Sequence, residues 1–445
     1  MKKGFWLIIL FFLYTPKSAR AELSSTQGIG ICHSAASLDE QFSWSYEAGP
    51  SVQWKYLEPS AGVYNFSALD ELIRSYQGRG VKIWLSLQTV AGNHAAPAWL
   101  ESMGARWFKI VRSDGRDHGL LAPWDQVYLE RLAIFLNAVN EHLESQSSAY
   151  QQTIGGIMMM SGGMYGEMQL WSGGAEGILI SSLGLNPDNL NQVYTFRAAY
   201  YNSVLNLVDL YLETFKRWPV ALQLGYNSLF IHPETRALIS LDQAVVEKKV
   251  PEYGARLFLK YNGLDPTNVG DGLDSARQKI ANYYRDLFSK WSSQAQVGFE
   301  IGHPWLFANP PDQASFLGGN YSWVVDRFTN IFEIAKAAKV SFVCFQTEMI
   351  SGLRSVPGWQ KFDEDLRAVP LPTTTLDCSC SSSAGRSFLA QADADCNSQT
   401  DLIDYNYWFE AFVRNSSFYR QQADFDCSGR AGIDDYEIWR QNFAF

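Results

Sequence analysis

The chain has 445 residues, of which 47% are hydrophobic, 14% are aromatic and only 18% are charged. This composition excludes an intrinsically disordered protein and supplies enough apolar residues for a large core and a small accessory domain. The formal net charge is −10, and no basic cluster offsets it, which argues against binding to nucleic acid or to an anionic membrane surface. The 15 tryptophans and 22 tyrosines favour flat, polar ligands, of which sugars are the main class.

Residues 1–21 have the pattern of a secretory signal peptide. Lys2 and Lys3 precede an apolar run over residues 5–14, and Ala19-Arg20-Ala21 provides a small-x-small cleavage site. The run is shorter than the roughly 20 residues that a membrane span requires, so an uncleaved anchor is the weaker interpretation. We therefore expect a secreted or cell-surface protein whose mature chain begins near Glu22, in surroundings where disulfides persist.

Residues 22–368 alternate between β-rich apolar runs and amphipathic helical patterns, which is typical of a parallel sheet covered by helices. Eight strands are predicted, at residues 28–33, 52–57, 81–88, 154–160, 220–226, 256–261, 297–300 and 340–347. The main helical patterns lie at residues 68–77, 126–143, 193–217, 276–291 and 323–338. These patterns predict an α/β fold, a (β/α)8 TIM barrel, whose active site lies at the carboxyl ends of the strands.

Two glutamates follow predicted strands at the mouth of this barrel. Glu167 ends a glycine-rich turn after the fourth strand, and Glu300 ends the seventh. Strands four and seven face one another in a barrel of eight, and glycosidic hydrolysis requires one protonated and one ionised carboxyl group. Two alternatives stay open: each glutamate forms a buried ion pair with an Arg or Lys, or Glu348 after strand eight takes the second role.

Further side chains near the mouth are candidates for binding substrate, because indole faces stack on pyranose rings. They follow the third, fourth and seventh predicted strands: Gln88, His94, Trp99, Trp171, His303 and Trp305. The alternative is that part of this set anchors loops at the rim. Neither histidine has a metal-ligand spacing with another His or Cys, so no catalytic metal is expected.

The segment from Trp54 to Phe66, WKYLEPSAGVYNF, resembles the second-strand region of clan A glycoside hydrolases, and Arg79-Gly80-Val81-Lys82 continues the resemblance. Ala96-Pro97-Ala98-Trp99-Leu100 is similar to an element of the family 42 β-galactosidases. The resemblance implies a retaining (β/α)8 enzyme and covers roughly residues 27 to 350.

The resemblance also implies roles for three residues. Glu167 corresponds to the acid/base and Glu300 to the nucleophile, while Tyr261 matches by position the tyrosine that hydrogen-bonds the nucleophile. The sequence departs from the clan at Gly166, where the clan has Asn before its acid/base. A Gly-x-x-Gly-Glu turn after strand four is similar to that of the inverting β-amylases, so retention depends on the clan A resemblance.

The composition changes after residue 368. Residues 369–390 are rich in Pro, Thr and Ser, as linkers of exported proteins are. Residues 391–445 contain a duplication with an offset of 31 residues, and oxygen-bearing side chains occupy positions 1, 3, 5 and 12 of each loop. This is the spacing by which an EF-hand-type loop binds Ca²⁺. The expected ligands are Asp393, Asp395, Asn397, Asp401 and Asp404 in one copy and Asp424, Asp426, Ser428 and Asp435 in the other.

Asp at position 12, followed by a helix and repeated once, resembles the dockerin module. The resemblance implies a small all-α module with structural Ca²⁺, and a cohesin-like or cell-surface protein as its partner. The alternative is an acidic duplicated module that binds no ion. Six cysteines allow 15 pairings; Cys32 and Cys344 are neighbours in a closed barrel, either as a disulfide or as two buried thiols.

The leading hypothesis is a secreted glycoside hydrolase that cleaves O-glycosidic bonds of a poly- or oligosaccharide and carries a calcium-dependent docking module. The alternatives are a non-catalytic carbohydrate-binding or scaffold protein on a barrel fold, and an inverting β-amylase-like hydrolase. The separation of the two carboxyl groups distinguishes the enzymes, at about 5–5.5 Å for retention and about 6.5–9.5 Å for inversion.

Overall fold

The computed structural model describes residues 26–32, 42, 44–89, 95–111, 117–161, 168, 175–225, 228–264, 275–301 and 324–372. The predicted signal peptide, the duplicated tail and most of the linker lie outside these residues. Within the described part of the chain, no helix is long and apolar enough to cross a membrane.

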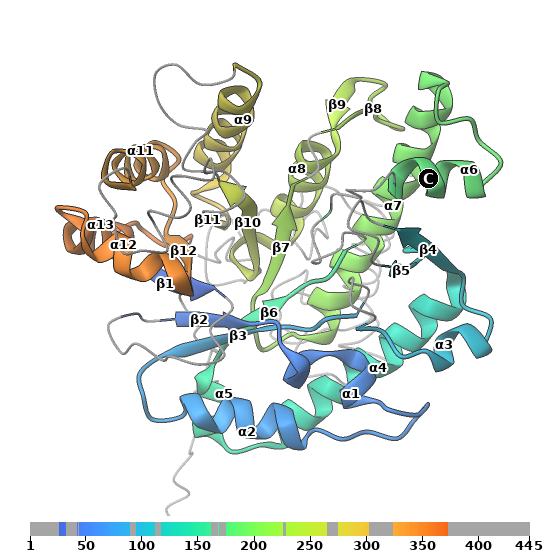
Figure 1. The fold of residues 1–445 in the computed structure, drawn as a ribbon, viewed down its shortest axis with the longest axis horizontal. Coiled ribbons are helices and arrows are strands. Elements are labelled where there is room, and N and C mark those ends of the chain that lie inside the picture. The colour runs from blue at the N-terminus through green and yellow to red at the C-terminus, as the bar shows by residue number, and fades with distance from the viewer. Residues whose placement is uncertain are drawn as a thin grey trace, which may run out of the picture.

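Eight parallel strands close into a barrel in the order β1-β12-β11-β10-β7-β6-β3-β2, and helices surround it (Figure 1). The strands are β1 (Gly28–Cys32), β2 (Trp44–Glu47), β3 (Lys82–Ser86), β6 (Ile154–Met158), β7 (Val220–Leu224), β10 (Leu257–Leu264), β11 (Gln296–Ile301) and β12 (Phe342–Gln346). The first strand pairs in parallel with the last, so the sheet has no free edge. The predicted eight-stranded parallel barrel is thereby confirmed.

One of the eight predicted strands is wrong. Residues 52–57 lie in the short helices η1 (Pro50–Val52) and α1 (Trp54–Leu57), and the second barrel strand is the preceding β2. The alternation of apolar and polar residues favoured a strand, but Pro at the first position of η1 presets a helical turn. The outcome is visible at Tyr56, which the strand pattern would bury and which is 51% exposed.

The five long helical patterns are confirmed to within a few residues. They correspond to α2 (Ser67–Tyr76), α4 (Gln126–Ser145), α7 (Leu190–Thr214), α9 (Ser275–Trp291) and α11 (Val324–Ala337). Side-chain caps define two starts: Asp125 accepts from the backbone N–H of Tyr128 at α4, and Asn189 caps α7. The other helices are α3 (Trp99–Ser102), α5 (Ser148–Thr153), α6 (Ala175–Ser182), α8 (Leu241–Tyr253), η2 (Gly254–Arg256), η5 (Thr347–Met349), α12 (Ile350–Arg354) and α13 (Trp359–Arg367).

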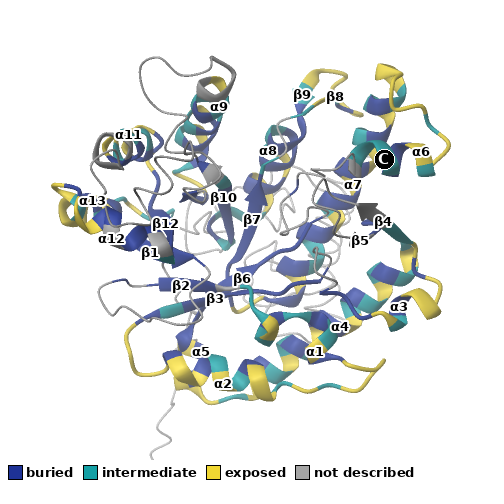
Figure 2. Cartoon of the chain, in the orientation of Figure 1, coloured by how far each residue is buried: buried dark blue, intermediate teal, exposed yellow. Residues whose placement is uncertain are grey.

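Two antiparallel hairpins lie outside the barrel order. One pairs β4 (Trp107–Val111) with β5 (Asp117–Leu121), and the other pairs β8 (Leu229–Ile231) with β9 (Leu238–Ser240). Figure 2 shows the buried residues concentrated on the barrel strands and on the inward faces of the helices, with exposed residues on the outer helix faces. This is the layering that buries a parallel sheet on both faces.

The barrel interior has its own core, separate from the apolar layer beneath the helices. Large aromatic side chains fill the amino-terminal half, among them Trp44, Trp84 and Phe342. Glycines leave room for them: a Cβ at Gly30 would lie 2.2 Å from Cε2 of Trp44. Polar side chains of the interior also lie near the carboxyl ends of the strands, among them Glu300 of β11 and Gln346 of β12.

Candidate active site

Glu300 lies near the carboxyl end of β11, inside the barrel, where active sites of this fold are built. The residue is only 5% exposed although its neighbours on the strand are apolar. A carboxylate in such a position is costly unless other groups compensate its lost hydration. Its surroundings therefore decide what this side chain does.

Three donors from three other strands converge on the Glu300 carboxylate. Tyr46 of β2 donates its hydroxyl to Oε2 at 3.0 Å, and Gln346 of β12 donates its amide to Oε1 at 3.0 Å. Lys260 of β10 donates to Oε2 and forms an ion pair with it. These donors stabilise the charged form of a carboxylate, so the arrangement suits a group that stays ionised.

Lys260 is itself enclosed, with a fully buried side chain. Its Nζ lies 4.4 Å from the centroid of the Tyr46 ring, so the ammonium group contacts both the face of this ring and the Glu300 carboxylate. Lys260, Tyr46 and Gln346 are not among the site residues predicted from the sequence. The sequence feature that could have indicated Lys260 is its position directly after the apolar run Leu257-Phe258-Leu259 in a predicted barrel strand. A lysine in a buried strand needs a partner, because an unpaired cation is rarely buried.

A disulfide links Cys32 of β1 to Cys344 of β12 beside this group, with a Cα–Cα distance of 5.6 Å. Of the two alternatives predicted for Cys32 and Cys344, the structure therefore contains the disulfide and not two free thiols. Both residues are completely buried. A sulfur atom of each and a carboxylate oxygen of Glu300 all lie within 4.8 Å of one another.

Tyr46 donates to Glu300, whereas Tyr261, the residue expected to do so from its position, lies on the other face of its strand. Tyr261 precedes Asn262 and follows Lys260 on β10, and successive side chains of a strand point to opposite faces. Because Lys260 points into the barrel, Tyr261 points outward, where its ring stacks on Tyr284 of α9 at 3.7 Å between centroids. Tyr261 therefore belongs to the layer between barrel and helices.

Two further predicted binding residues are described. Gln88 is buried beyond the end of β3, and its side-chain amide donates to Oγ of Ser86 at 3.1 Å. Trp99 begins α3 and is fixed by structural contacts: its indole N–H donates to the backbone oxygen of Glu58 at 3.2 Å, and the Arg131 guanidinium lies 5.1 Å from its ring centroid. Trp99 thus fits the alternative of a loop anchor.

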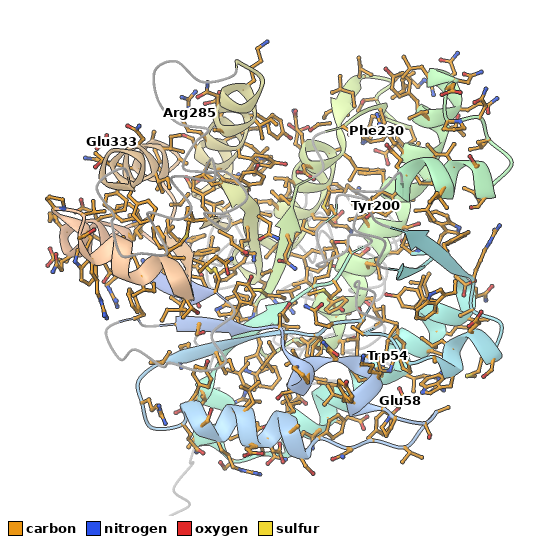
Figure 3. All side chains as sticks on the ribbon, in the orientation of Figure 1. Trp54, Glu58, Tyr200, Phe230, Arg285 and Glu333 are labelled. Carbon is orange, nitrogen blue, oxygen red and sulfur yellow. A yellow bond between two sulfur atoms is a disulfide. The ribbon has the colours of Figure 1, made fainter. Side chains whose placement is uncertain are left out.

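Glu58 is the centre of a second buried polar network, between α1 and α4 (Figure 3). Its carboxylate accepts the indole N–H of Trp54 at 2.7 Å and the backbone N–H of Gly62 at 2.7 Å. Arg131 of α4 completes the network with an ion pair at 2.6 Å. Glu58 and Gly62 belong to the segment that resembles the clan A glycoside hydrolases. In this segment the Glu58 network therefore stabilises a turn on the outside of the barrel.

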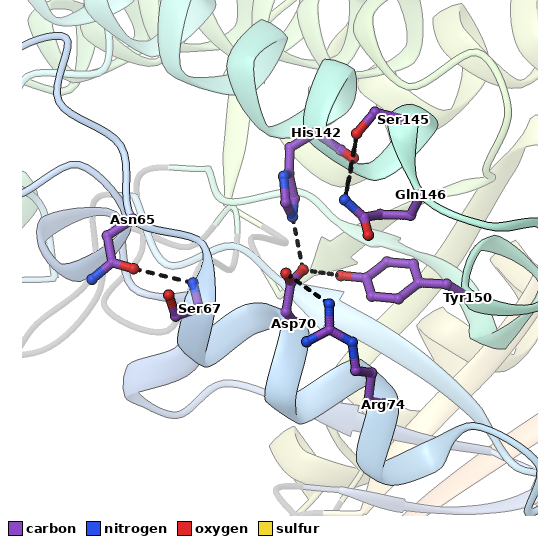
Figure 4. Close-up of polar contacts among 8 residues, drawn as sticks. All are labelled: Asn65, Ser67, Asp70, Arg74, His142, Ser145, Gln146 and Tyr150. Atoms are coloured by element: carbon purple, nitrogen blue, oxygen red, sulfur yellow. Dashed lines mark hydrogen bonds and ion pairs between the residues drawn. The ribbon is translucent and has the colours of Figure 1, made fainter.

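A third polar cluster joins three helices around Asp70 of α2 (Figure 4). Asp70 accepts hydrogen bonds from His142 of α4 at 2.7 Å, Tyr150 of α5 at 2.7 Å and Arg74 at 3.1 Å. Burial alone would raise the pKa of Asp70, but the hydrogen bonds from His142 and Tyr150 and the nearby positive charges outweigh it and lower the pKa. This cluster holds helices together and lies outside the barrel.

The remaining predicted residues cannot be placed. Glu167, His94, Trp171, His303 and Trp305 lie outside the described residues, as do all nine predicted calcium ligands of the tail. The backbone of Glu348 is described in η5, but its side chain is not.

Comparison with known proteins gives one family match. Residues 47–118 match the glycoside hydrolase family 42 model, described as β-galactosidase. No curated protein matches the chain significantly. The matched segment runs from β2 through the Glu58 network to β5, and so covers the part of the chain in which the resemblance was strongest.

Solved structures similar to this chain include two β-galactosidases and a xylanase. The β-galactosidase of Halorubrum lacusprofundi is 14% identical, with a TM-score of 0.43, and the match covers 72% of this chain and 52% of that one. The β-galactosidase of Marinomonas ef1 is 12% identical, with a TM-score of 0.42 and coverage of 72% and 53%. An intracellular xylanase of Thermoanaerobacterium saccharolyticum is 11% identical, with a TM-score of 0.37 and coverage of 75% and 90%.

The chain spans about half the length of the β-galactosidases to which it is similar. Because these identities are low, the fold is assigned from the strand order of the barrel itself. The similarity to a glycoside hydrolase family is confined to residues 47–118. The family match agrees with the enzyme class predicted from the sequence. The chain thus combines a closed eight-stranded parallel barrel with a segment, residues 47–118, that matches the glycoside hydrolase family 42 model.

Proposed function

We propose that this protein hydrolyses O-glycosidic bonds of a poly- or oligosaccharide, with Glu300 as the nucleophile and Glu167 as the acid/base. The observation that carries the proposal is the Glu300 carboxylate near the carboxyl end of β11, with Lys260, Tyr46 and Gln346 as its donors. The family match over residues 47–118 supports the reaction class.

The three hydrogen-bond donors around Glu300 suit the role of nucleophile better than that of general acid. A retaining glycosidase needs one carboxylate that is ionised when substrate binds, attacks the anomeric carbon and leaves as water hydrolyses the glycosyl ester. The Lys260 cation and the Tyr46 hydroxyl stabilise Glu300 before attack and again when it departs as a carboxylate. The protonated partner must come from another residue, and Glu167 has that role in the clan A resemblance.

A non-catalytic barrel is the second candidate, and the Glu300–Lys260 ion pair is the observation that favours it. A buried carboxylate that is fully compensated serves equally well as a structural element of a carbohydrate-binding or scaffold protein. An inverting hydrolase is the third candidate, through the turn that ends at Glu167. Measurable turnover of a glycoside would distinguish either enzyme from a non-catalytic barrel. The anomer of the first-formed product would distinguish an inverting enzyme from a retaining one.

The test begins with the full chain and a panel of chromogenic glycosides. Glu300→Gln is expected to abolish turnover and to leave sugar binding intact, because the amide keeps the shape but cannot attack. Glu71→Gln, an exposed glutamate of α2, is the matched control and should retain full activity. Unchanged turnover in Glu300→Gln would remove the assignment, and a wild-type chain without turnover on any glycoside would favour the scaffold.

The stereochemical outcome is tested on the most active substrate. NMR of the first-formed product should show the anomer of the substrate, as retention requires. In Glu300→Ala, azide is expected to restore bond cleavage and to give a glycosyl azide, because a small anion fits where the carboxylate was. Release of the opposite anomer by the wild type would instead identify an inverting enzyme.

We also propose that the protein is secreted and that residues 391–445 bind structural Ca²⁺ and dock to a cohesin-like or cell-surface protein. The donor set of Asp, Asn and Ser oxygens in the two loops suits a hard cation. Because Ca²⁺ would bind only the folded tail, a chelator should lower the melting temperature of its transition in the full chain. The variant Asp393→Ala with Asp424→Ala should lose that response, and a chelator-insensitive wild type would refute the calcium proposal.

A further inference from the structure

The Cys32–Cys344 disulfide has no part in the chemistry proposed above, yet it lies in the barrel interior beside the nucleophile. Both cysteines are completely buried, and they belong to the interior core with Tyr46 and Trp44. Their sulfur atoms and a Glu300 carboxylate oxygen lie within 4.8 Å of one another. Within the β1–β12 seam, the disulfide lies at the level of Glu300, since Cys344 is the register partner of Glu300.

The strand register connects the disulfide to the residues that hold Glu300. On β1, Cys32 is the register partner of Tyr46 on one side and of Gln346 on the other. On β12, Cys344 is the register partner of Glu300 itself. The disulfide therefore joins two strands next to the site. One is β12, which carries Gln346 and pairs with the Glu300 strand, and the other is β1, which pairs with the Tyr46 strand.

The disulfide joins β1 to β12, whose ladder runs over five register pairs from Gly28–Phe342 to Cys32–Gln346, and the ladders on either side of these two strands are shorter in the described residues. β1 pairs with β2 from Gly30 to Cys32, and β12 pairs with β11 from Phe342 to Cys344. By comparison, β10 pairs with β11 along Phe258 to Leu264. Each of these flanking ladders ends at a cysteine of the disulfide in the described residues, so the covalent link lies where their hydrogen-bonded pairing ends.

We propose that the Cys32–Cys344 disulfide is a positioning element of the active site, which keeps Tyr46 and Gln346 at hydrogen-bonding distance from Glu300 during turnover. The proposal rests on the proposed function. Reduction by a dithiol takes up two electrons and two protons, breaks the S–S bond and leaves two thiols, while the dithiol becomes a cyclic disulfide. Strands β1 and β12 are then held together at this level by their hydrogen-bonded ladder alone, and we expect the donors to shift relative to the nucleophile.

The disulfide also suits the environment predicted from the amino terminus, since such bonds persist outside the cytoplasm. Its complete burial means that a reductant reaches it only when the barrel opens locally. Substitution is therefore the sharper perturbation. The variant Cys32→Val with Cys344→Ala keeps an apolar pair of similar volume and removes the cross-link.

This variant is expected to lose roughly tenfold to a hundredfold in kcat, with KM within about twofold of the wild type, because a displacement of about 1 Å at a catalytic group costs up to about 10²-fold. The acid limb of its kcat/KM profile should move to higher pH, because Glu300 loses donors that stabilise its ionised form. The titratable groups in contact with Glu300 in the described structure include Lys260 and Tyr46.

The matched control is Val343→Ala, which removes packing on the outer face of the same strand. It should lower the melting temperature and leave kcat and the acid limb unchanged. If the double cysteine variant behaves like Val343→Ala, the disulfide is merely structural and the proposal fails. If the double variant does not fold, Cys32→Ser alone is assayed in the same way.

A measurement independent of activity checks the bond itself. The unreduced, denatured chain is alkylated, and the peptides that contain Cys32 and Cys344 are examined by mass spectrometry. We expect one cross-linked peptide pair without alkylation, and alkylated Cys32 would overturn the proposal. A wild type without turnover refutes the proposed function, whereas an active wild type with an equally active double variant refutes this inference alone.

Discussion

Replacing Lys260 with methionine tests the central ion pair of the candidate site. Methionine has nearly the length of lysine and fills the same space, but it provides neither the charge nor the donor. Lys260 is completely buried, and the Glu300 side chain is 7% exposed. Water therefore cannot compensate Glu300 when its cation is removed.

The magnitude follows from what remains around the carboxylate. Breaking a buried pair by removing one partner costs about 3–5 kcal/mol. Tyr46 and Gln346 still donate to Glu300, so we expect the lower end, about 3 kcal/mol, or roughly a hundredfold in the unfolding equilibrium constant. The loss should be smaller in acid than at pH 7, because a protonated Glu300 carries no charge that needs a partner.

The assay is thermal and urea unfolding of the full chain, followed by tryptophan fluorescence at pH 7 and pH 4. A double-mutant cycle with Glu300→Gln isolates the pair. The double variant should be more stable than Lys260→Met alone, because replacing the carboxylate removes the stranded charge. The kcat of Lys260→Met alone reports whether the lysine also serves turnover, since Glu300→Gln is expected to have none.

Two results would refute this reasoning. If Lys260→Met is as stable as the wild type at pH 7, Glu300 is compensated without the lysine, and the ion pair is not what allows its burial. If the destabilisation is equal at pH 7 and pH 4, the effect comes from lost packing and not from an unpaired charge.

Three further predictions concern residues outside the catalytic group. Glu58→Gln should destabilise the barrel by about 3 kcal/mol, because Arg131 keeps its charge in a buried network; melting curves measure the loss, and kcat below the melting range should be unchanged. Gly30→Ala should cost about 3 kcal/mol by overpacking against the enclosed Trp44 ring, and the additional change Trp44→Phe should recover part of the melting temperature. Asp70→Asn should cost less than about 1 kcal/mol at pH 7, because the cluster is partly solvent-exposed. The lowered pKa means that the stability contributed by Asp70 is complete above its ordinary value of 3.8 and is lost as the pH falls through the lower folded pKa, so the variant and wild-type melts should converge in strong acid.

The sequence predicts most of the barrel because its strands are continuous apolar runs separated by amphipathic helices. The second strand is missed because β2 has only four residues and includes polar Ser45, whose hydroxyl donates to the backbone oxygen of Ile31 at 3.0 Å. A longer alternating pattern at residues 52–57 lies close by and resembles a strand more strongly. Local periodicity does not distinguish the two, and the pairing of β2 with β1 and β3 decides between them.

The position of Glu300 follows from the sequence, whereas its partners do not. Its donors come from residues 46, 260 and 346, and only the closure of the barrel brings those strands to one point. The choice between Tyr261 and Tyr46 depends on which face of each strand is inside. That choice follows from alternation once Lys260 is known to point inward, but the sequence provides no such reference.

Glu58 and Glu300 show why a buried ion pair alone assigns no function. Each is an almost inaccessible carboxylate paired with one cation and held by further donors. Their positions differ: Glu58 lies between two helices outside the barrel, whereas Glu300 lies near the carboxyl end of a barrel strand, where this fold binds its substrates. The same burial therefore supports opposite expectations. Glu58→Gln should change the melting temperature and leave kcat intact, and Glu300→Gln should abolish turnover in a chain that still folds; if both variants lose only stability, the candidate site is a structural ion pair.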